Sequence, residues 1–567
     1  MHNVLLTTIF LPAFGALVAW MFGSRGKAAV RQSALVTAGL TLALAIYLVV
    51  QYFKDQGLVG NYAVKEFAWL GHSAQIHFGF GLDGLSVWMF GLSALLTFTA
   101  VLVSWEAVTD RAAGFYALLL LLETGMIGVF SARDIIMFYI FFEFTLIPLF
   151  FLIGIWGHEE RRYAANKFFL FTFTGSVLAL LGLIGIVLWV YNSSGTLTFS
   201  IPQLHELLGQ HPMPMDAAHG YLQFWIFLAL VAGFAVKVPL IPFHTWLPLA
   251  HTQAPTGGSI DLAGILLKLG TYGILRFCLP MLPDATAMCM PWIMWLAVIG
   301  IVYGALVSLV QSDLKKLIAY SSVSHMGFVI LGFFALNRLG LQGGILQMIN
   351  HGLSSAGLFA VVGMIYERYH TRQIAELGGL AKRTPLLATF MVVFTMAAIG
   401  LPGLNGFVGE FFILLGTFQR AWAEAPGSLG PQLLVVAVLA VSGVVLGAWY
   451  MLWMVQRVFF GPLKEGHVSA EKAEKIRDLS WHEVAALSPL VFFIVWIGLF
   501  PNVFLKPIAP AAEEIIARTN QPLKDYYAAK PAVDAKQAAQ MPSAKSTVQL
   551  PVEKNPSPDQ MKTAADP

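Results

Sequence analysis

Fourteen long apolar segments constrain the fold of this chain more than any other feature of its sequence. A bilayer-spanning helix needs about 20 mainly apolar residues in succession. Fourteen segments meet that requirement, at 3–22, 30–52, 78–103, 113–131, 134–155, 164–192, 221–252, 258–279, 288–310, 314–336, 343–365, 384–418, 431–456 and 484–504. The pattern therefore predicts an all-α integral membrane protein with about fourteen transmembrane helices.

Charged residues are scarce, which excludes an ordinary soluble enzyme. Asp, Glu, Lys and Arg make up 11% of the chain, against roughly a quarter in a typical soluble domain. The net charge of +3 comes from basic residues scattered between apolar runs, so no basic patch indicates binding to nucleic acid. Cys278 and Cys289 are the only cysteines, and no Cys/His cluster has metal-ligand spacing. We therefore expect no metal and no cofactor in this chain.

The distribution of basic residues predicts how the helices are oriented. Loops after odd-numbered spans carry 18 Lys and Arg residues, whereas loops after even-numbered spans carry 6. Because cytoplasmic loops are enriched in Lys and Arg, we expect the odd loops in the cytoplasm and both termini on the other side. No Lys or Arg precedes the first span, and a polar tail follows residue 505. These features favour a bacterial inner (plasma) membrane over an organelle.

Seven ionisable side chains inside the predicted spans stand out. They are Glu123, Glu143, Lys237, Lys268, His325, His351 and Glu410. A charged group near mid-bilayer costs about 2.5 to 3.5 kcal/mol on insertion scales, and it tends to persist where it pairs, hydrates or functions. Any one of the seven is compatible with a structural ion pair or a hydrogen-bonded interior histidine. The set as a whole favours a proton path, because burial and neighbouring charges bring the pKa values of such groups towards ambient pH.

The acids differ in how strongly the sequence supports a role in a relay. Glu123 has the weakest support, because no recognisable motif surrounds it. Asp83, Asp134 and Asp261 lie at span ends, where an acid at a helix N-terminus is a sufficient explanation. We therefore leave these three aspartates out of the predicted relay.

Two predicted spans contain helix-breaking residues next to an intramembrane charge. Lys237 is followed by VPLIPFHTWLP, which includes Pro239 and Pro242, and Glu410 is preceded by GLPGLNGFVG, which includes Pro402 and Gly403. Proline removes a helix hydrogen bond and glycine loosens the backbone, so we expect both helices to break near mid-membrane. Broken helices at matching places in two halves are typical of inverted repeats with an ion site at the breaks.

Counting the spans supports two repeats of five helices. Spans 4 to 8 and 9 to 13 form two blocks with the broken helix fourth in each, and an odd number of spans forces opposite orientations. Two independent proline kinks are the alternative. The predicted parts are an N-terminal three-helix segment (1–112), two half-channels (113–280 and 288–460), a cytoplasmic loop with the last span (461–505) and a polar tail (506–567) that is disordered or bound by a partner.

Three long motifs resemble the antiporter-like proton-translocating subunits of respiratory complex I, a proton-pumping NADH:quinone oxidoreductase. The motifs are FYIFFEFTLIPLFFLIGIWG at 138–157, HTWLPLAHTQAPTGGSIDLAGILLKLGTYG at 244–273 and KKLIAYSSVSHMGFV from residue 315. The resemblance covers about residues 75 to 460. The superfamily also includes Mrp-type cation/proton antiporter subunits and membrane subunits of energy-converting hydrogenases. Glu410 stands where relatives generally carry Lys, which points to one subunit type within the family.

The resemblance implies roles for the intramembrane charges. Glu143 and Lys237 are implied as the ion pair of the first half-channel, Lys268 as the central lysine and Glu410 as the end of the second half-channel. His325 and His351 are implied on a hydrated axis between Lys268 and Glu410. The sequence departs from the family at Leu249, where HTWLPDAH is usual, so the role of that aspartate is lost or moved here.

The resemblance also implies partners and cofactors outside this chain. Neighbouring antiporter-like subunits, other membrane subunits and lipids would surround the chain, and NAD, FMN, Fe–S clusters and quinone would be bound by partner subunits. The chain would then belong to an enzyme, an H⁺-translocating NADH:quinone oxidoreductase, without holding a redox centre. The alternatives are a subunit of an Mrp-type antiporter or of an energy-converting hydrogenase, and a passive membrane scaffold. Two intramembrane lysines disfavour a sodium site.

Overall fold

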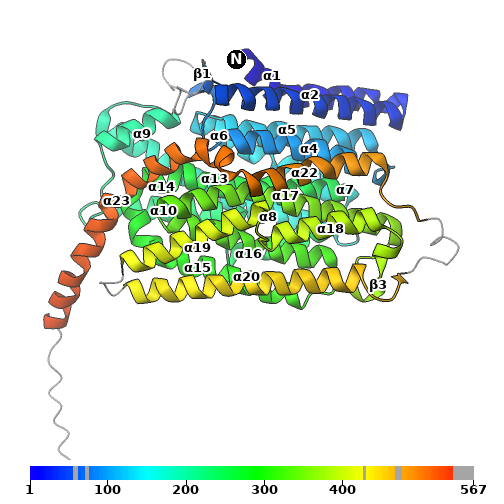
Figure 1. Cartoon of the computed structure of the whole chain (residues 1–567). Coiled ribbons are helices and arrows are strands. Elements are labelled where there is room, and N and C mark those ends of the chain that lie inside the picture. The colour runs from blue at the N-terminus through cyan, green and yellow to red at the C-terminus, as the bar shows by residue number, and fades with distance from the viewer. Residues whose placement is uncertain (55–61, 71–75, 425–428, 467–475, 541–567) are drawn as a thin grey trace, which may run out of the picture. The chain divides into compact units, whose positions relative to one another are not determined.

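Helices dominate the computed structural model, which describes residues 1–54, 62–70, 76–424, 429–466 and 476–540. Within these residues, twelve helical segments are long and apolar enough to cross a membrane. The long helices run roughly parallel to one another (Figure 1). The predicted fold class, an all-α integral membrane protein, is confirmed.

The helical segments follow the predicted spans closely. They are α1 His2–Met21, η1 Phe22–Arg25, α2 Lys27–Lys54, α4 Val87–Ala107, α5 Ala112–Ser131, α6 Ile135–Phe144, α7 Leu146–Trp156, α8 Arg161–Ser194, α9 Ile201–Gln210, α10 Leu222–Lys237, η2 Phe243–Thr245, α11 Trp246–Gln253, α12 Thr256–Asp261, η3 Leu262–Leu266, α13 Leu267–Gly273, η4 Ile274–Cys278, α14 Leu279–Met281, α15 Pro283–Leu309, α16 Leu314–Phe334, α17 Arg338–Tyr369, η5 Ile374–Glu376, η6 Leu380–Lys382, α18 Pro385–Ala398, α19 Asn405–Ala423, α20 Leu429–Phe459, α22 Trp481–Leu499 and α23 Pro501–Gln540. Segments η3 and η4 are π-helical turns within one span.

Polar side chains fix where several of these helices begin. Asp134, Asp313 and Asn337 each accept a hydrogen bond from a backbone N–H in the first turn of α6, α16 and α17. Ser480 and Glu483 form a capping box at the start of α22. Such caps satisfy amide groups that a helix start leaves unpaired, so they set the first residue of each of these helices.

A β-hairpin precedes the third predicted span. Strands β1 (Tyr62–Leu70) and β2 (Ile76–Leu82) pair antiparallel, and β3 (Leu377–Gly378) pairs with β4 (Lys464–Glu465) elsewhere. The third span was predicted to start at residue 78, but its helix α4 begins at Val87. The run IHFGFGL is apolar enough to extend a hydropathy segment, while its aromatic residues suit a strand and its glycine residues disfavour a helix.

The two helices predicted to break are interrupted. The segment 221–252 divides into α10 and α11, and the segment 384–418 divides into α18 and α19. Helices α10, α11 and α18 have 16, 8 and 14 residues, fewer than a bilayer-spanning helix needs, whereas α19 has 19. The relation between the two five-helix blocks stays a prediction, because residues Met1–Leu523 form a single compact unit.

The tail was predicted to be disordered or bound by a partner, and disorder is wrong for residues 506–540. These residues belong to α23. A buried stripe at helical spacing explains its first part, with Phe504, Ile508, Ala512, Ile515 and Leu523 on one face. Residues 541–567 lie outside the described part of the chain, and Lys524–Pro567 form a second unit.

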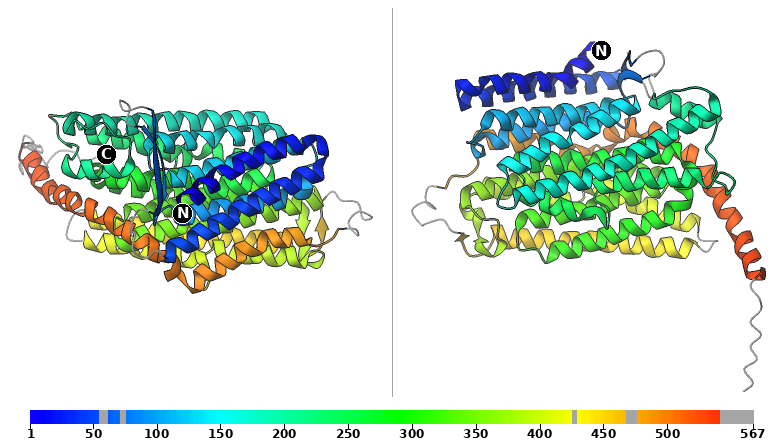
Figure 2. Two further views of the ribbon diagram at one scale, coloured as in Figure 1. Left: turned by 90° about the horizontal axis from the view of Figure 1, so that it is seen from above. Right: turned by 180° about the vertical axis from the view of Figure 1, so that it is seen from behind.

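Exposure separates lipid-facing helices from the polar interior. The α1–α2 pair (blue) and α20 (yellow) lie along opposite edges of the bundle in two views (Figures 1 and 2), and no more than 39% of each of their most apolar windows is buried. In contrast, α17 is buried throughout its window, and the span 256–281 is 94% buried. These two interior spans carry His351 and Lys268, so both groups face protein.

Small residues bring α8 and α10 close together beside the first break. A Cβ on Gly233 would lie 2.5 Å from the carbonyl oxygen of Gly175, and a Cβ on Gly175 would lie 2.8 Å from the Val236 side chain. Membrane helices approach closely where both present small residues. This contact fixes the end of α10, where Lys237 is the last residue.

Candidate functional site

The central lysine contacts a histidine in the most buried part of the bundle. Lys268, on α13, is fully buried, and its Nζ lies 2.7 Å from Nδ1 of His351 on α17. The ammonium also donates a hydrogen bond to the carbonyl oxygen of Ala263, in the π-helical turn η3. Single π-turns occur frequently at functional positions in helices. A proton on Lys268 therefore has an acceptor in direct contact.

The contacts continue from His351 to the acid on α19. The rings of His351 and His325, which lies on α16, are 5.5 Å apart between centroids. Nδ1 of His325 lies 3.2 Å from Oε1 of Glu410, although the atoms are not aligned as a hydrogen bond. Glu410 is only 5% exposed. The structure thus brings four predicted relay residues, Lys268, His351, His325 and Glu410, into one series.

Amides surround Glu410, and the sequence analysis did not identify them. Gln347 donates a hydrogen bond to Oε1 of Glu410 at 3.1 Å, and Asn350 donates to the side-chain oxygen of Gln347 at 3.1 Å. Asn350 also donates to the backbone oxygen of Asn405, at the start of α19. The available signal was helical spacing on α17. Gln347 lies four residues before His351, and Asn350 lies three residues after Gln347.

Glycine residues form the break that positions Glu410. Helix α18 ends at Ala398 and α19 begins at Asn405, with Pro402 and Gly403 between them. Gly400 and Gly403 have φ angles of 71° and 92°, a region that favours glycine. A Cβ on Gly400 would lie 2.9 Å from Oε2 of Glu410. The carboxylate therefore lies directly against the break.

Lys237 lies beside the other break and contacts an aromatic residue. Its Nζ donates a hydrogen bond to the carbonyl oxygen of Phe142 at 3.0 Å and lies 3.3 Å from the centroid of the Phe142 ring. Pro239 and Pro242 follow in the interruption between α10 and η2. A buried ammonium over an aromatic face gains a cation–π interaction, so the direct contacts of Lys237 in this structure are with Phe142.

The implied ion pair between Glu143 and Lys237 is not formed in this structure. Glu143 is half-buried, its Oε1 has no hydrogen-bond partner, and within the described residues no ion pair joins it to Lys237. The two residues are nevertheless neighbours, since the Lys237 ammonium binds the carbonyl of the residue before Glu143. The Glu143 carboxyl and the Lys237 ammonium are therefore neighbours that do not form a direct ion pair.

Glu123 lies away from this series. It is fully buried on α5, and neither carboxylate oxygen has a hydrogen-bond partner in the described part of the chain. Asp134 caps α6 as expected, but Asp261 does not cap a helix start. It is the last residue of α12, fully buried, with both oxygens lacking partners among the described residues. The N-terminal explanation for Asp261 is therefore wrong.

His251 is a further buried residue that was not predicted from the sequence. It lies on α11 with its ring stacked on Phe359 at 4.4 Å, and neither ring nitrogen has a partner among the described residues. Buried polar atoms normally find partners. The signal was its place in the motif HTQAP, which begins within the second half of the first broken helix.

Comparisons with known proteins identify the family of this fold. The family model described as "NADH:quinone oxidoreductase/Mrp antiporter, TM" matches residues 132–425. NADH-quinone oxidoreductase subunit M of Rhodobacter capsulatus is 42% identical over 528 residues, which are 91% of this chain and 97% of that protein. The chain belongs to this family.

Other known proteins match over similar lengths. NADH-ubiquinone oxidoreductase chain 4 of Chondrus crispus is 39% identical, covering 90% of this chain and 96% of that protein. A chain in the structure of respiratory complex I from Thermus thermophilus with bound NADH has a TM-score of 0.78 at 32% identity, covering 91% and 99% of the two chains. A chain of the Mrp complex from Dietzia sp. has a TM-score of 0.75 at 20% identity, covering 92% and 99%, which shows a shared fold. The subunit M relatives match the subunit type that Glu410 indicated.

Leu249 stands where the family motif HTWLPDAH has an aspartate. Leu249 lies half-buried on α11, one residue before the fully buried Ala250. Within the described residues, no three His, Cys, Asp or Glu side chains are grouped so that they could hold a metal ion. The buried lysine, histidine and carboxyl groups described above can exchange protons between nitrogen and oxygen atoms.

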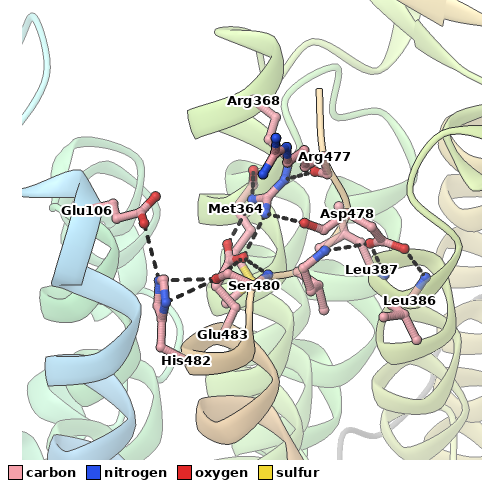
Figure 3. A network of polar contacts seen from close by, with 11 residues as sticks. Glu106, Met364, Arg368, Leu386, Leu387, Arg477, Asp478, Ser480, His482 and Glu483 are labelled. Atoms are coloured by element: carbon pink, nitrogen blue, oxygen red, sulfur yellow. Dashed lines mark hydrogen bonds and ion pairs between the residues drawn. The ribbon is translucent and has the colours of Figure 1, made fainter. Parts of the chain in front are cut away.

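A polar network closes one end of this antiporter-type bundle (Figure 3). Arg368 on α17 forms two hydrogen bonds with the carboxylate of Glu483 on α22, at 2.8 and 2.7 Å. Asp478 accepts hydrogen bonds from the backbone N–H groups of Leu386 and Leu387, in the first turn of α18. The network therefore joins α17, α22 and the first half of the second broken helix.

A polar cavity of about 370 Å³ lies near the other end. Arg276 and Asp83 form an ion pair of 2.5 Å in its wall. Burial of the Asp83 carboxyl opposes ionisation, but the Arg276 guanidinium outweighs it and lowers the pKa of Asp83 below its usual value. This ion pair joins the loop before α4 to η4, the π-helical turn that follows α13.

Proposed function

We propose that the chain is a proton-translocating membrane subunit of a proton-pumping NADH:quinone oxidoreductase in a bacterial inner membrane. The observation that carries the proposal is the buried series Lys268–His351–His325–Glu410. It connects the interior span 256–281 to the second broken helix through contacts of 2.7 and 3.2 Å at its two ends. Helix-packing ion pairs alone do not require two adjacent histidines between a lysine and a carboxylate.

The series can move one proton without any other reactive group. The ammonium of Lys268 gives its proton to Nδ1 of His351, leaving a neutral amine and an imidazolium. His351 passes a proton to His325, directly or through one bridging water, and Nδ1 of His325 passes a proton to the Glu410 carboxylate. Histidine suits the middle of such a path because its ordinary pKa lies near 6.5.

The first half-channel would control when Lys268 is loaded. Lys237 and Glu143 lie next to each other without a direct ion pair. An ion pair favours the charged forms of both partners, and this stabilisation is lost when the partners separate. Making and breaking the Glu143–Lys237 pair would therefore drive a proton onto or away from Lys268. Quinone reduction in other subunits, which would hold NAD, FMN and Fe–S clusters, supplies the energy.

Proton pumping in membrane vesicles energised by NADH tests the proposal. Wild type is compared with Lys237→Ala and Glu410→Ala at matched abundance of the complex and matched inhibitor-sensitive electron transfer. Lys316→Ala is the control, since Lys316 is exposed at the start of α16. We expect fewer protons pumped per electron in the two buried variants and no change in the control. An unchanged ratio in the buried variants would reject the proposal.

The same experiment separates the alternatives. A passive scaffold predicts that Lys237→Ala lowers the amount of assembled complex and the pumping in equal proportion. An Mrp-type antiporter subunit predicts that the chain moves protons in exchange for sodium, without NADH. Measuring vesicle acidification with and without a sodium gradient distinguishes that outcome from redox-driven pumping.

A further inference from the structure

Three helices meet beside the central lysine at a place that the proposed relay does not use. The hydroxyl of Tyr116 on α5 donates a hydrogen bond to the backbone oxygen of Ser104 on α4. A Cβ on Gly257 of α12 would lie 2.5 Å from the Ser104 hydroxyl, and one on Gly264 would lie 2.1 Å from the Leu96 side chain. Helices α5 and α12 therefore both lie directly against the same stretch of α4.

Helical spacing places three buried polar groups at one level of this junction. Asp261 lies between Gly257 and Gly264 on the face of α12 that meets α4, and Glu123 lies seven residues after Tyr116 on the face of α5 that meets α4. Running antiparallel to both, α4 presents Thr97 at that level, seven residues before Ser104. Glu123 and Asp261 therefore approach this level from the two helices that pack against α4.

None of the three groups has a partner among the described residues. Thr97, Glu123 and Asp261 are each 0% exposed, and the hydroxyl and all four carboxyl oxygens lack hydrogen bonds there. Two ionised carboxylates in such a site are disfavoured by desolvation and by mutual repulsion. At least one proton must therefore reside on the pair. A hard metal cation would require about six oxygen ligands, whereas these side chains supply five.

The lysine side chain reaches towards this pair. Asp261 and Lys268 are separated by seven residues of one helical span, roughly 10 Å along its axis. Nζ of Lys268 binds the carbonyl of Ala263, two residues from Asp261. One or two waters would bridge the remaining gap.

We propose that Glu123 and Asp261, with the Thr97 hydroxyl, form a proton-binding carboxyl pair that supplies Lys268. In the transfer, the O–H bond of one carboxyl breaks, its proton passes through water to Nζ of the neutral amine, and a carboxylate facing an ammonium remains. The inference rests on the proposed function and extends its relay by two acids that come from α5 and α12. Thr97 is a positioning residue that donates to the carboxylate after the proton leaves.

Isosteric variants of the intact complex test this inference. Glu123→Gln, Asp261→Asn and the double variant keep the shape of the site and remove its acidic protons. Pumping per electron is measured in NADH-energised vesicles alongside Lys268→Ala. We expect the double variant to lose as much pumping as Lys268→Ala. A triple variant that combines Glu123→Gln, Asp261→Asn and Lys268→Ala should lose no more pumping than Lys268→Ala alone. Asp134→Asn, at an acid that caps α6, is the matched control and is expected to pump as wild type.

The outcomes distinguish this inference from the proposed function. If the double variant pumps as wild type while Lys268→Ala does not, the carboxyl pair is rejected and the relay stands. If neither variant changes pumping, both are rejected. Redox-induced infrared spectra of the wild-type complex and the two single variants provide a readout that does not depend on the double variant assembling. The spectrum of each single variant should lose part of the protonated-carboxyl band seen in the wild type. A band that is the same in the wild type and both variants would overturn the inference. A band that shifts only when sodium is present would also overturn it.

Discussion

The lack of a side chain at Gly406 determines where Glu410 lies. Gly406, in the first turn of α19, is so close to the end of α18 that a Cβ would lie 2.0 Å from the backbone oxygen of Ala397. Glu410 follows one turn later on α19, with its Oε2 against Gly400. The absence of a side chain at Gly406 therefore sets the distance between the two halves of the broken helix.

We predict that Gly406→Ala lowers proton pumping without removing an ionisable group. The added methyl must push α19 away from α18, and overpacking of this kind costs typically 1 to 3 kcal/mol. The shift moves Glu410 relative to His325 and Gln347. Pumping per electron in vesicles should fall towards that of Glu410→Ala at equal amounts of complex.

Gly300→Ala provides the matched control for that substitution. Gly300 lies within α15, and nothing lies within 4 Å of the position of its added Cβ. Alanine favours a helix over glycine by about 0.5 to 1 kcal/mol, so this variant should be stable and pump normally. Equal pumping by Gly406→Ala and Gly300→Ala would show that the break does not position Glu410.

At the scale of elements, a loop residue holds the first half of the second broken helix. Asp478 caps α18 from outside that helix, and Arg368 holds the same loop through the backbone oxygens of Arg477 and Asp478. Arg368 in turn binds Glu483 on α22 (Figure 3). The position of α18 thus depends on an ion pair between two other helices.

We predict that Arg368→Met loosens the start of α18 and that Glu483→Gln partly reverses the effect. Removing one member of a mostly buried ion pair leaves an uncompensated charge and costs about 3 kcal/mol or more. Amide hydrogen exchange at Leu386 and Leu387 should accelerate about a hundredfold in Arg368→Met. The double variant no longer leaves a carboxylate at position 483 without its arginine, so its exchange should be slower than that of Arg368→Met, and equal rates in both would contradict the ion-pair explanation.

Sequence patterns predicted the long elements and the breaks, because both depend on local chemistry. Apolar runs of bilayer length and the residues Pro242, Pro402 and Gly403 are visible without tertiary contacts. The β1–β2 hairpin and the helix over 506–540 were missed because their apolar residues were assigned to a span or to a tail. In the site, the charged and histidine residues were found by their rarity in apolar spans. Gln347, Asn350 and Asp261 required the packing of helices that are distant in the sequence.

For the whole molecule, the two ends of the bundle face different compartments. Helix α9 and strand β3 lie at opposite ends of the bundle in Figure 1. Helix α9 belongs to an even-numbered loop, whereas β3 belongs to an odd-numbered loop, and the odd loops carry 18 of the basic residues against 6. The basic end, which includes β3, should therefore face the cytoplasm, and the end that includes α9 should face the other side of the membrane.

Cysteine labelling from each side of the membrane tests this orientation. Cysteines are introduced singly at Ser24 and Glu159, in odd-numbered loops, and at Gln210, in an even-numbered loop; all three positions are exposed. The background carries Cys278→Ala and Cys289→Ser, which removes the native thiols. A membrane-impermeant maleimide added to intact cells should label Gln210→Cys alone, and inverted vesicles should reverse the pattern. Because positive loops are retained on the cytoplasmic side, labelling of Ser24→Cys in intact cells would invert the orientation assigned to both half-channels.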